Sequence, residues 1–312
     1  MRVLVTGASG YVGKYLLDQL VKHKYEVKAL TRQSSLKIKD VEIIRGDIIK
    51  PESFNSALDG VDAVFHNAAY VKDWGKKSEF YKNNIEGTKN IAEACNEKGV
   101  EKIIYTSSAG VYGFPNIKDE ITENFPKNPL NAYQMSKLEG ENILKQYTNI
   151  ENSNIRPPLI LGGDGHTGKV IMEKIEQGKM TYVGSGNQYI SLVHPNDVSQ
   201  CLRLALENDG KSNIFNVVSF VCTIKELFDE IAHQLGVESP KKHISYTLAY
   251  CVAFFKEIFV TKDPSLTRFR VKSLGTTRKI SCERAKKELG YKAKYDLQST
   301  VEDMVSWYKQ YK

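Results

Sequence analysis

The chain has 312 residues, of which 41% are hydrophobic and 26% charged, a balance that is typical of a folded globular protein and excludes a disordered or fibrous class. The net charge is +7. The segment from Lys262 to Lys294 contains eleven Lys and Arg residues but only three acidic residues. This basic segment could attract an anionic substrate or a membrane surface, or be a solvated face. Because it lacks the pattern of a nucleic-acid-binding module, we expect no nucleic-acid partner.

Five scattered cysteines, with no Cys-x-x-Cys and no histidine at ligand spacing, favour reduced thiols in small core positions and no metal site. The N-terminus lacks the features of a signal peptide, so we expect a cytoplasmic protein. The longest apolar run, residues 246–255, is too short to cross a bilayer. It predicts an amphipathic or buried helix, with peripheral membrane contact as an alternative.

The first 160 residues alternate short apolar runs with longer amphipathic ones. Helical spacing predicts helices over residues 11–23 and 86–99. Runs rich in β-branched residues and bounded by turn residues predict strands at 2–7, 26–31, 41–47, 62–68 and 101–108. Strands that alternate with helices predict an α/β fold, a doubly wound parallel sheet of the Rossmann type.

The pattern changes after Pro158, where glycine turns divide the chain into shorter units. From residue 224 to the end it is mostly helical. We therefore predict a dinucleotide-binding domain over residues 1–158, with 191–218 folding back onto it. A smaller, mainly helical substrate domain would consist of residues 159–190 and 219–312.

A glycine-rich turn, TGASGYVG, follows the first predicted strand and opens the first helix. Gly7, Gly10 and Gly13 would let the backbone approach a pyrophosphate, and the helix N-terminus would hold its charge. The second strand ends at Thr31 and Arg32, where NAD-binding folds usually carry a carboxylate for the ribose hydroxyls. A guanidinium without that carboxylate favours NADP(H) over NAD(H), unless Arg32 is only a solvated turn residue.

Tyr133 and Lys137 lie four residues apart in NAYQMSKLEG, which places both side chains on one face of a helix. The spacing alone does not distinguish a surface pair from a reactive centre. The surrounding chain, however, resembles the extended short-chain dehydrogenase/reductase family over nearly its whole length. Besides the tyrosine and lysine, the resemblance rests on TGASGYVG (6–13), GDI (46–48), HNAA (66–69), NNIEGT (83–88), TSSAGVYG (106–113), HPNDV (194–198), FNV (215–217) and KKELGY (286–291).

The resemblance implies four catalytic residues. Tyr133 would be the general acid and base, and Lys137, with the positive nicotinamide, would bring its pKa towards neutrality. Ser108 would bond the substrate oxygen, and Asn84 would complete a proton path or fix the active-site helix. The implied cofactor-binding residues are Gly7, Ser9, Gly10, Tyr11, Val12, Gly13, Thr31, Arg32, Asp47, Ile48, Asn67, Ala68, Ala69, Tyr133, Lys137 and Pro157. We assign His66 no catalytic role.

The C-terminal part indicates the reaction. Sugar-nucleotide enzymes of the family usually carry Arg-x-Gly-Asp where this chain has Val271, Ser273 and Leu274. Residues 262–271 and 155–165 instead resemble the branch of 3β-hydroxysteroid dehydrogenases and dihydroflavonol reductases. This implies an NADP(H)-dependent oxidoreductase that interconverts an alcohol and a ketone on a largely apolar small molecule, in a homodimer. The alternatives are an NDP-sugar epimerase or dehydratase with tightly bound NAD, and a non-catalytic cofactor-sensing protein.

Overall fold

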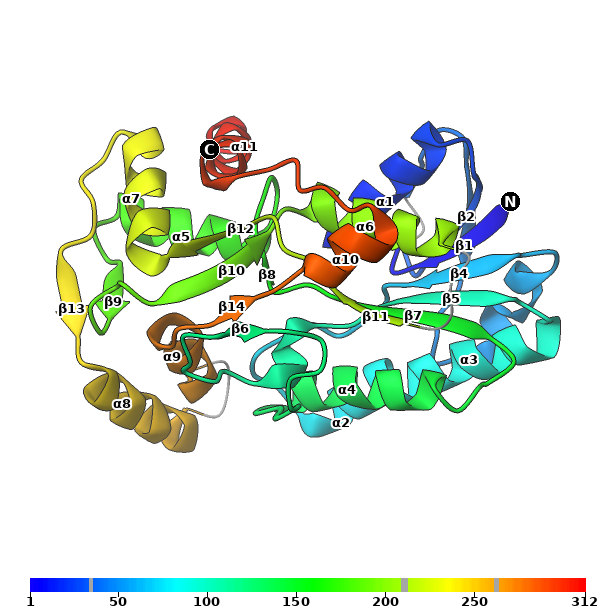
Figure 1. Cartoon of the computed structure of the whole chain (residues 1–312), viewed down its shortest axis with the longest axis horizontal. Helices are drawn as coiled ribbons and strands as arrows, with labels where there is room; N and C mark the ends of the chain where they lie inside the picture. Colours follow the sequence, from blue (N-terminus) through cyan, green and yellow to red (C-terminus); the bar gives the residue numbers. More distant parts are fainter. Residues whose placement is uncertain (34–35, 209–212, 261–263) are drawn as a thin grey trace.

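The structure, a computed structural model, describes residues 1–33, 36–208, 213–260 and 264–312. A seven-stranded parallel sheet forms the larger part (Figure 1). From edge to edge its strands are β11 (Asn213–Asn216), β7 (Glu151–Arg156), β5 (Lys102–Thr106), β4 (Ala63–His66), β1 (Arg2–Thr6), β2 (Glu26–Thr31) and β3 (Val41–Arg45). The order reverses between β1 and β4, the topological switch point of a doubly wound sheet. The predicted α/β class is confirmed.

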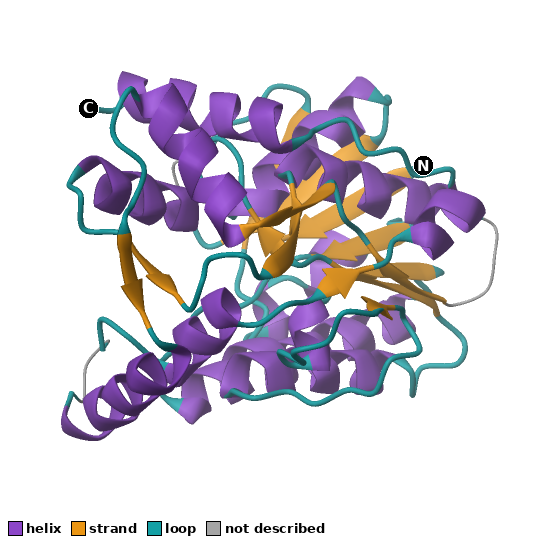
Figure 2. Ribbon diagram, turned by 60° about the vertical axis from the view of Figure 1, so that its left-hand side comes forward, coloured by secondary structure: helices purple, strands orange, loops and turns teal. Residues whose placement is uncertain are grey.

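Helices cover both faces of this sheet (Figure 2). α1 (Tyr11–Lys22) packs against α6 (Pro195–Glu207) on one face, and α3 (Gly87–Lys98) packs against α4 (Ala132–Leu144) on the other. Along β1, Val3 and Val5 belong to the buried cluster under α1, whereas Leu4 belongs to the cluster under α3. Because both faces are buried, β1 and β4 in the middle of the sheet appear in the sequence as continuous apolar runs.

Three smaller sheets and further helices form the other part. The sheets are β12 (Phe220–Thr223) with β10 (Tyr189–Val193) and β8 (Leu159–Ile160), β13 (Lys242–Ile244) with β9 (Thr181–Val183), and β14 (Lys279–Ile280) with β6 (Glu120–Ile121). The remaining α-helices of the described chain are α2 (Lys77–Phe80), α5 (His166–Glu176), α7 (Ile224–Leu235), α8 (Tyr246–Phe259), α9 (Arg268–Gly275), α10 (Glu283–Leu289) and α11 (Leu297–Gln310). Of these, α2 packs against α4, and α10 packs against α6 and β11 of the large-sheet part. The 3₁₀ turns are Pro51–Ser53, Asn55–Leu58 and Ala109–Tyr112, and Tyr81–Glu86 is π-helical.

The sequence pattern from residue 224 onward did not predict β13 and β14, which have three and two residues. Strands this short carry no measurable period-two pattern. The chain also crosses between the two parts, because β10 lies in a small sheet while α6 and β11, which follow it, pack on or join the large one.

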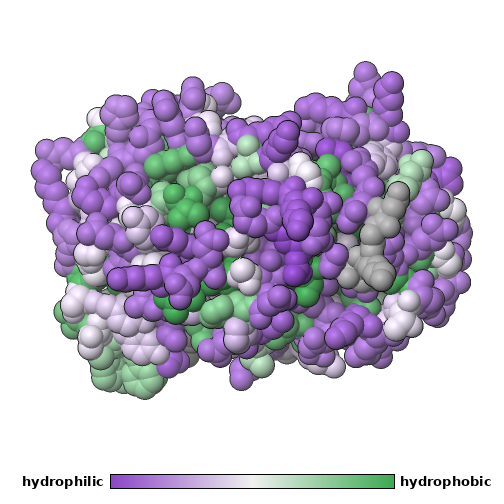
Figure 3. Space-filling view, viewed as in Figure 1, coloured by the Kyte–Doolittle hydropathy of each residue, from purple (hydrophilic) through white to green (hydrophobic). Residues whose placement is uncertain are grey.

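The apolar run at 246–255 forms most of α8, so the predicted helix is present, but the alternative of a buried helix is wrong. Only Ala249 and Ala253 of this helix are buried, whereas Leu248, Phe255 and Phe259 are 56%, 56% and 77% exposed. Figure 3 shows the resulting hydrophobic surface at the lower left, where α8 lies in Figure 1. No helix among the described residues is both long enough and apolar enough to cross a membrane.

Four of the five cysteines are buried, as we expected for cysteines in core positions. Cys251, on α8, is exposed, so that expectation is wrong for this residue. The reason is the same one that exposes its neighbours: the helix has a narrow contact surface with the rest of the molecule.

Gly140 on α4 leaves no room for a side chain against β5, because an added Cβ would lie 2.3 Å from the hydroxyl oxygen of buried Tyr105. We expect Gly140→Ala to lower the free energy of unfolding by about 1–3 kcal/mol through overpacking. Tyr105→Phe removes the oxygen nearest to that Cβ, so the double variant should lose less than the sum of the single variants. Urea unfolding of the four proteins tests this, and additive losses would contradict the packing argument.

Candidate active site

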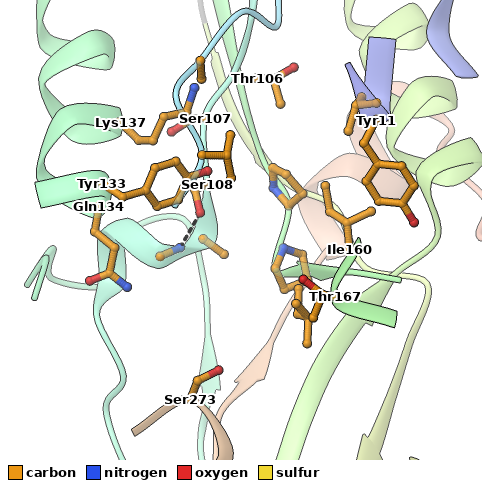
Figure 4. A pocket seen from close by; sticks show the side chains of 18 of the residues that line it. Tyr11, Thr106, Ser107, Ser108, Tyr133, Gln134, Lys137, Ile160, Thr167 and Ser273 are labelled. Atoms are coloured by element: carbon orange, nitrogen blue, oxygen red, sulfur yellow. Dashed lines mark hydrogen bonds between the residues drawn. The ribbon is translucent and has the colours of Figure 1, made fainter. Parts of the chain in front are cut away.

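A cavity of about 550 Å³ lies at the carboxyl edge of the large sheet, beside the switch point between β1 and β4. In α/β folds this edge is where ligands bind. Figure 4 shows Ser108, Tyr133 and Lys137 grouped on one wall, with Tyr11 and Ile160 across the cavity and Ser273 of α9 at its far end. The cavity therefore brings residues of both parts of the chain together.

The glycine loop after β1 is shaped by contacts that leave no room for side chains. Gly7 has φ +65°, and a Cβ there would lie 2.6 Å from the backbone nitrogen of Ala68. A Cβ on Gly13 would lie 2.2 Å from the carbonyl oxygen of Gly7, and one on Gly10 would lie 3.0 Å from it. The N-cap of α1 is Gly10, and the first turn contains no acidic residue. This cradle fits a pyrophosphate at a helix N-terminus.

An unsatisfied amide in the same cavity also fits a bound cofactor. Asn67, Ala68 and Ala69 after β4 line the cavity with Tyr11, Val12 and Pro157. The Thr106 hydroxyl donates to Asn67 Oδ1, but the buried Asn67 Nδ2 has no hydrogen-bond partner among the described residues. A buried donor without an acceptor is costly, so a ligand acceptor at this point is favourable.

At the end of β2, the hydroxyl of buried Thr31 donates to Ser9 Oγ at 3.2 Å and accepts from the Gln33 nitrogen at 3.1 Å. The Arg32 side chain is 71% exposed and lies 3.9 Å from the Asp47 carboxylate. The two side chains predicted to contact the adenosine half thus lie side by side. Ile48, also predicted there, is buried and packs under α3 against Gly87.

α4 carries the tyrosine and the lysine. The helix begins after Asn131, whose side chain accepts from the Gln134 nitrogen at 2.9 Å. Tyr133 and Lys137, one turn apart, both line the cavity. Lys137 is buried, with Nζ 4.2 Å from the centroid of the Tyr105 ring. The position of this ammonium in the interior, rather than in solvent, argues against a surface pair.

Burial is the main cause of the shifted pKa values of Tyr133 and Lys137. Burial raises the pKa of Tyr133 to about 12, an effect that a hydrogen bond from Ser108 opposes. It lowers the pKa of Lys137 to about 7, which the Glu141 carboxylate opposes. Ser108 itself accepts from the Gly110 nitrogen at 3.0 Å, which fixes its side chain beside Tyr133 (Figure 4).

Asn84 does not line the cavity. Its Oδ1 accepts from the Tyr70 nitrogen at 2.6 Å, and its Nδ2 donates to the Tyr70 carbonyl at 3.1 Å and to Ser136 Oγ at 2.8 Å. The residue lies in the π-helical turn, a distortion that is frequent at functional sites. Of the two roles left open by the sequence, this geometry favours fixing the active-site helix.

His66 is fully buried and bonded on both sides, with Nδ1 2.8 Å from Thr6 Oγ1 and Nε2 2.9 Å from Thr88 Oγ1. Burial lowers the pKa of His66 to about 3, so the imidazole is neutral. Its role is to connect β1, β4 and α3 below the cavity.

Sequence reasoning missed the ion pair that holds α4 in place. Arg156 Nε and Nη2 donate to the two oxygens of Glu141 at 2.8 and 2.5 Å, and Ser107 Oγ donates to Glu141 Oε1 at 2.5 Å. Burial acts to lower the pKa of Arg156, but the contacts with Glu141 and Tyr112 together outweigh it and raise the pKa. The only available signal was an arginine directly before Pro157, at the end of the mainly polar segment 151–156, and it does not identify a partner.

The comparisons with known proteins agree with the fold. Residues 3–217 match the model of the NAD dependent epimerase/dehydratase family. The chain belongs to this family, and it is thus a short-chain-type, NAD(P)-dependent oxidoreductase/epimerase. The resemblance to the extended short-chain family is confirmed.

Two relatives of similar identity catalyse different reactions. The chain is 30% identical to the mouse (Mus musculus) sterol-4-alpha-carboxylate 3-dehydrogenase, decarboxylating, over 96% of this chain and 89% of the relative. It is also 30% identical to the N-acetyl-alpha-D-glucosaminyl-diphospho-ditrans,octacis-undecaprenol 4-epimerase of Escherichia coli O157:H7, over 95% and 91%. The UDP-glucuronic acid 4-epimerase from Bacillus cereus, solved with NAD, shares the fold with a TM-score of 0.81 at 22% identity, over 100% and 99%.

We expect Asn84→Ala to lower the free energy of unfolding by about 1–3 kcal/mol, because it removes the partner of the part-buried Tyr70 nitrogen and carbonyl and the donor to buried Ser136 Oγ. Asn83→Ala is the matched control. Among the described residues, the Asn83 side chain donates to the Glu79 carbonyl on an exposed turn, so the loss should stay within about 0.5 kcal/mol. Urea unfolding measures both, and equal losses would remove Asn84 from the support of α4.

Proposed function

We propose that the chain is an NADP(H)-dependent oxidoreductase that interconverts an alcohol and a ketone on a largely apolar small molecule. The observation that carries this proposal is the placement of Tyr133, Lys137 and Ser108 on one wall of a cavity whose substrate side is mainly apolar. That side includes Phe114, Ile160, Phe269 and Ile280.

The residues of the glycine loop and of the β4 end would hold the cofactor. Gly7, Gly10 and Gly13 would receive the pyrophosphate, and Asn67 Nδ2 would donate to an acceptor of the nicotinamide half. When bound, NADP(H) would supply or accept the hydride. Lys137 would hydrogen-bond the nicotinamide ribose.

The chain's own residues would move the proton. The Tyr133 hydroxyl would donate to the carbonyl oxygen in reduction and accept from the alcohol in oxidation. Burial raises the pKa of Tyr133, and the hydrogen bond from Ser108 opposes this. An ammonium on Lys137 would lower the pKa of this phenol further. Ser108, fixed by the Gly110 nitrogen, would hold the substrate oxygen near Tyr133.

The position at which sugar-nucleotide enzymes usually carry a diphosphate-binding arginine supports an apolar substrate. Val271 occupies it, fully buried among Val183, Ala249 and Ala253. A side chain packed in that way offers nothing to a diphosphate. The 4-epimerase reaction remains the second candidate because of the Escherichia coli relative. NAD retained through purification would favour it.

Tyr133→Phe keeps the ring and removes the proton donor, so we expect kcat for ketone reduction with NADPH to fall by at least about a hundredfold. The dissociation constant of NADPH should stay within about twofold. A panel of ketones tests this by absorbance, with Tyr81→Phe, an exposed tyrosine on the π-helical turn, as control. A loss of threefold or less on substrates that the unmodified protein reduces would exclude Tyr133 from the mechanism.

The preference for NADP(H) rests on Arg32 and on the lack of a carboxylate at Thr31. A charge-assisted contact from Arg32 to the 2′-phosphate in this exposed position should favour NADP over NAD by roughly tenfold. Thr31→Asp combined with Arg32→Asn should invert the preference, because the carboxylate would bond the ribose hydroxyls and repel the phosphate. Fluorescence titration with both cofactors decides this, and equal affinities in the unmodified protein would refute it.

We also propose the location, the oligomeric state, the domain division and the membrane contact that the sequence predicts. We propose a cytoplasmic homodimer, a division into 1–158 with 191–218 and 159–190 with 219–312, and contact of α8 with a membrane surface. The exposed apolar side chains of Leu248, Phe255 and Phe259 support the last of these.

A further inference from the structure

Arg278 is a buried cation on the substrate side of the cavity. It lies between α9 and β14, and only 8% of it is exposed. Its guanidinium carbon is 4.7 Å from the centroid of the Phe114 ring, and both residues line the cavity. Ser273, its neighbour on α9, lies at the end of the cavity away from Tyr133 (Figure 4).

The hydrogen bonds of Arg278 are long and reach neutral acceptors. Nη1 donates to the carbonyl and the hydroxyl oxygen of Thr276, both at 3.2 Å, and Nη2 donates to Ser273 Oγ at 3.4 Å. In the part of the chain that the structure describes, no Asp or Glu forms an ion pair with it. Burial lowers the pKa of Arg278 to about 10, in line with the missing ion pair.

Arg156, the second buried arginine among the described residues, provides the contrast. Arg156 has Glu141 as a bidentate partner and accordingly keeps a raised pKa. A buried cation without such a partner is unfavourable in the free protein, and it becomes favourable when a ligand brings the missing anion.

We propose that Arg278 binds a carboxylate of the substrate, so that the substrate class is an alcohol or ketone with an apolar body and one carboxylate. The reaction named in this inference rests on the proposed function, whereas the binding of an anion by Arg278 does not depend on it. A guanidinium matches a carboxylate in geometry and in charge.

The number of cations favours a carboxylate over a diphosphate. Among the described residues that line the cavity, Lys137 and Arg278 are the lysine and arginine side chains, and Lys137 lies on the wall with Tyr133. Arg278 alone thus remains for the substrate's anion. The apolar surroundings of Phe114, Phe269 and Ile280 would strengthen a single ion pair and would leave the further charges of a diphosphate without partners.

The test compares octanoate with octan-1-ol, which share a chain and differ in charge, by calorimetric titration of the NADP-saturated protein. Octanoate should bind at least about tenfold more tightly than the alcohol. Arg278→Leu should lose at least that factor for octanoate and leave the alcohol within about twofold, while Arg278→Lys keeps part of the preference. Arg284→Leu removes one charge from the same basic segment on α10, outside the cavity lining, and should change neither affinity.

Thermal unfolding and NADP affinity of Arg278→Leu complete the test, because removal of an uncompensated charge should not destabilise the protein. Equal octanoate affinity in the unmodified protein and Arg278→Leu would overturn the inference. Binding of UDP that depends on Arg278, with octanoate unaffected, would also overturn it by assigning the cation to a diphosphate.

The outcomes separate this inference from the proposed function. If octanoate binding depends on Arg278 but no ketone or alcohol is turned over, the inference stands and the oxidoreductase proposal fails. If neutral ketones are reduced and octanoate binding does not depend on Arg278, the proposed function stands and the inference fails.

Discussion

The geometry of the cavity depends on the buried ion pair between Glu141 and Arg156. Glu141 lies on α4 one turn after Lys137, and Arg156 ends β7, so the pair joins the helix to the large sheet. Loss of one partner would leave an unpaired charge in the interior, at a cost of about 3–5 kcal/mol. Ser107, at the end of β5, adds a third element to the same carboxylate. These contacts set the rotation of α4, and with it the direction of Tyr133 and Lys137.

A second set of contacts fixes α4 from the opposite side and extends to the strand that precedes the glycine loop. Thr6 on β1 bonds His66, His66 bonds Thr88, Thr88 donates to the Asn84 carbonyl, and Asn84 donates to Ser136 on α4. This continuous row is neutral, since burial lowers the pKa of His66 to about 3. The proposed cofactor side and the proposed proton-transfer side are therefore held in one rigid frame, as a preorganised site requires.

The sequence predicted correctly those strands and site residues whose local sequence pattern agrees with their packing in the folded protein. β1 and β2 are apolar because both faces of the sheet are covered, and Gly7 is required by its positive φ and by the approach of Ala68. Tyr133 and Lys137 share a helix face, which spacing alone reveals. The pairing of Glu141 with Arg156 and the lack of a partner for Arg278 were not accessible, because they depend on contacts between distant segments. The exposure of α8 was missed for the same reason: an apolar pattern shows which residues avoid water but not which neighbours cover them.

The central claim is that α4 buries the ammonium of Lys137 in the cavity, where it can act on Tyr133. Burial makes the pKa of Lys137 lower in the folded protein than in the unfolded chain, so the folded protein should also gain stability as the pH rises from about 7 to 10.5. The most direct test is an NMR titration of the lysine side-chain signals in the cofactor-free protein, with Lys137→Met to assign the resonance. The account predicts that this resonance titrates near pH 7, well below the other lysines, and a midpoint at or above 10.5 would contradict it.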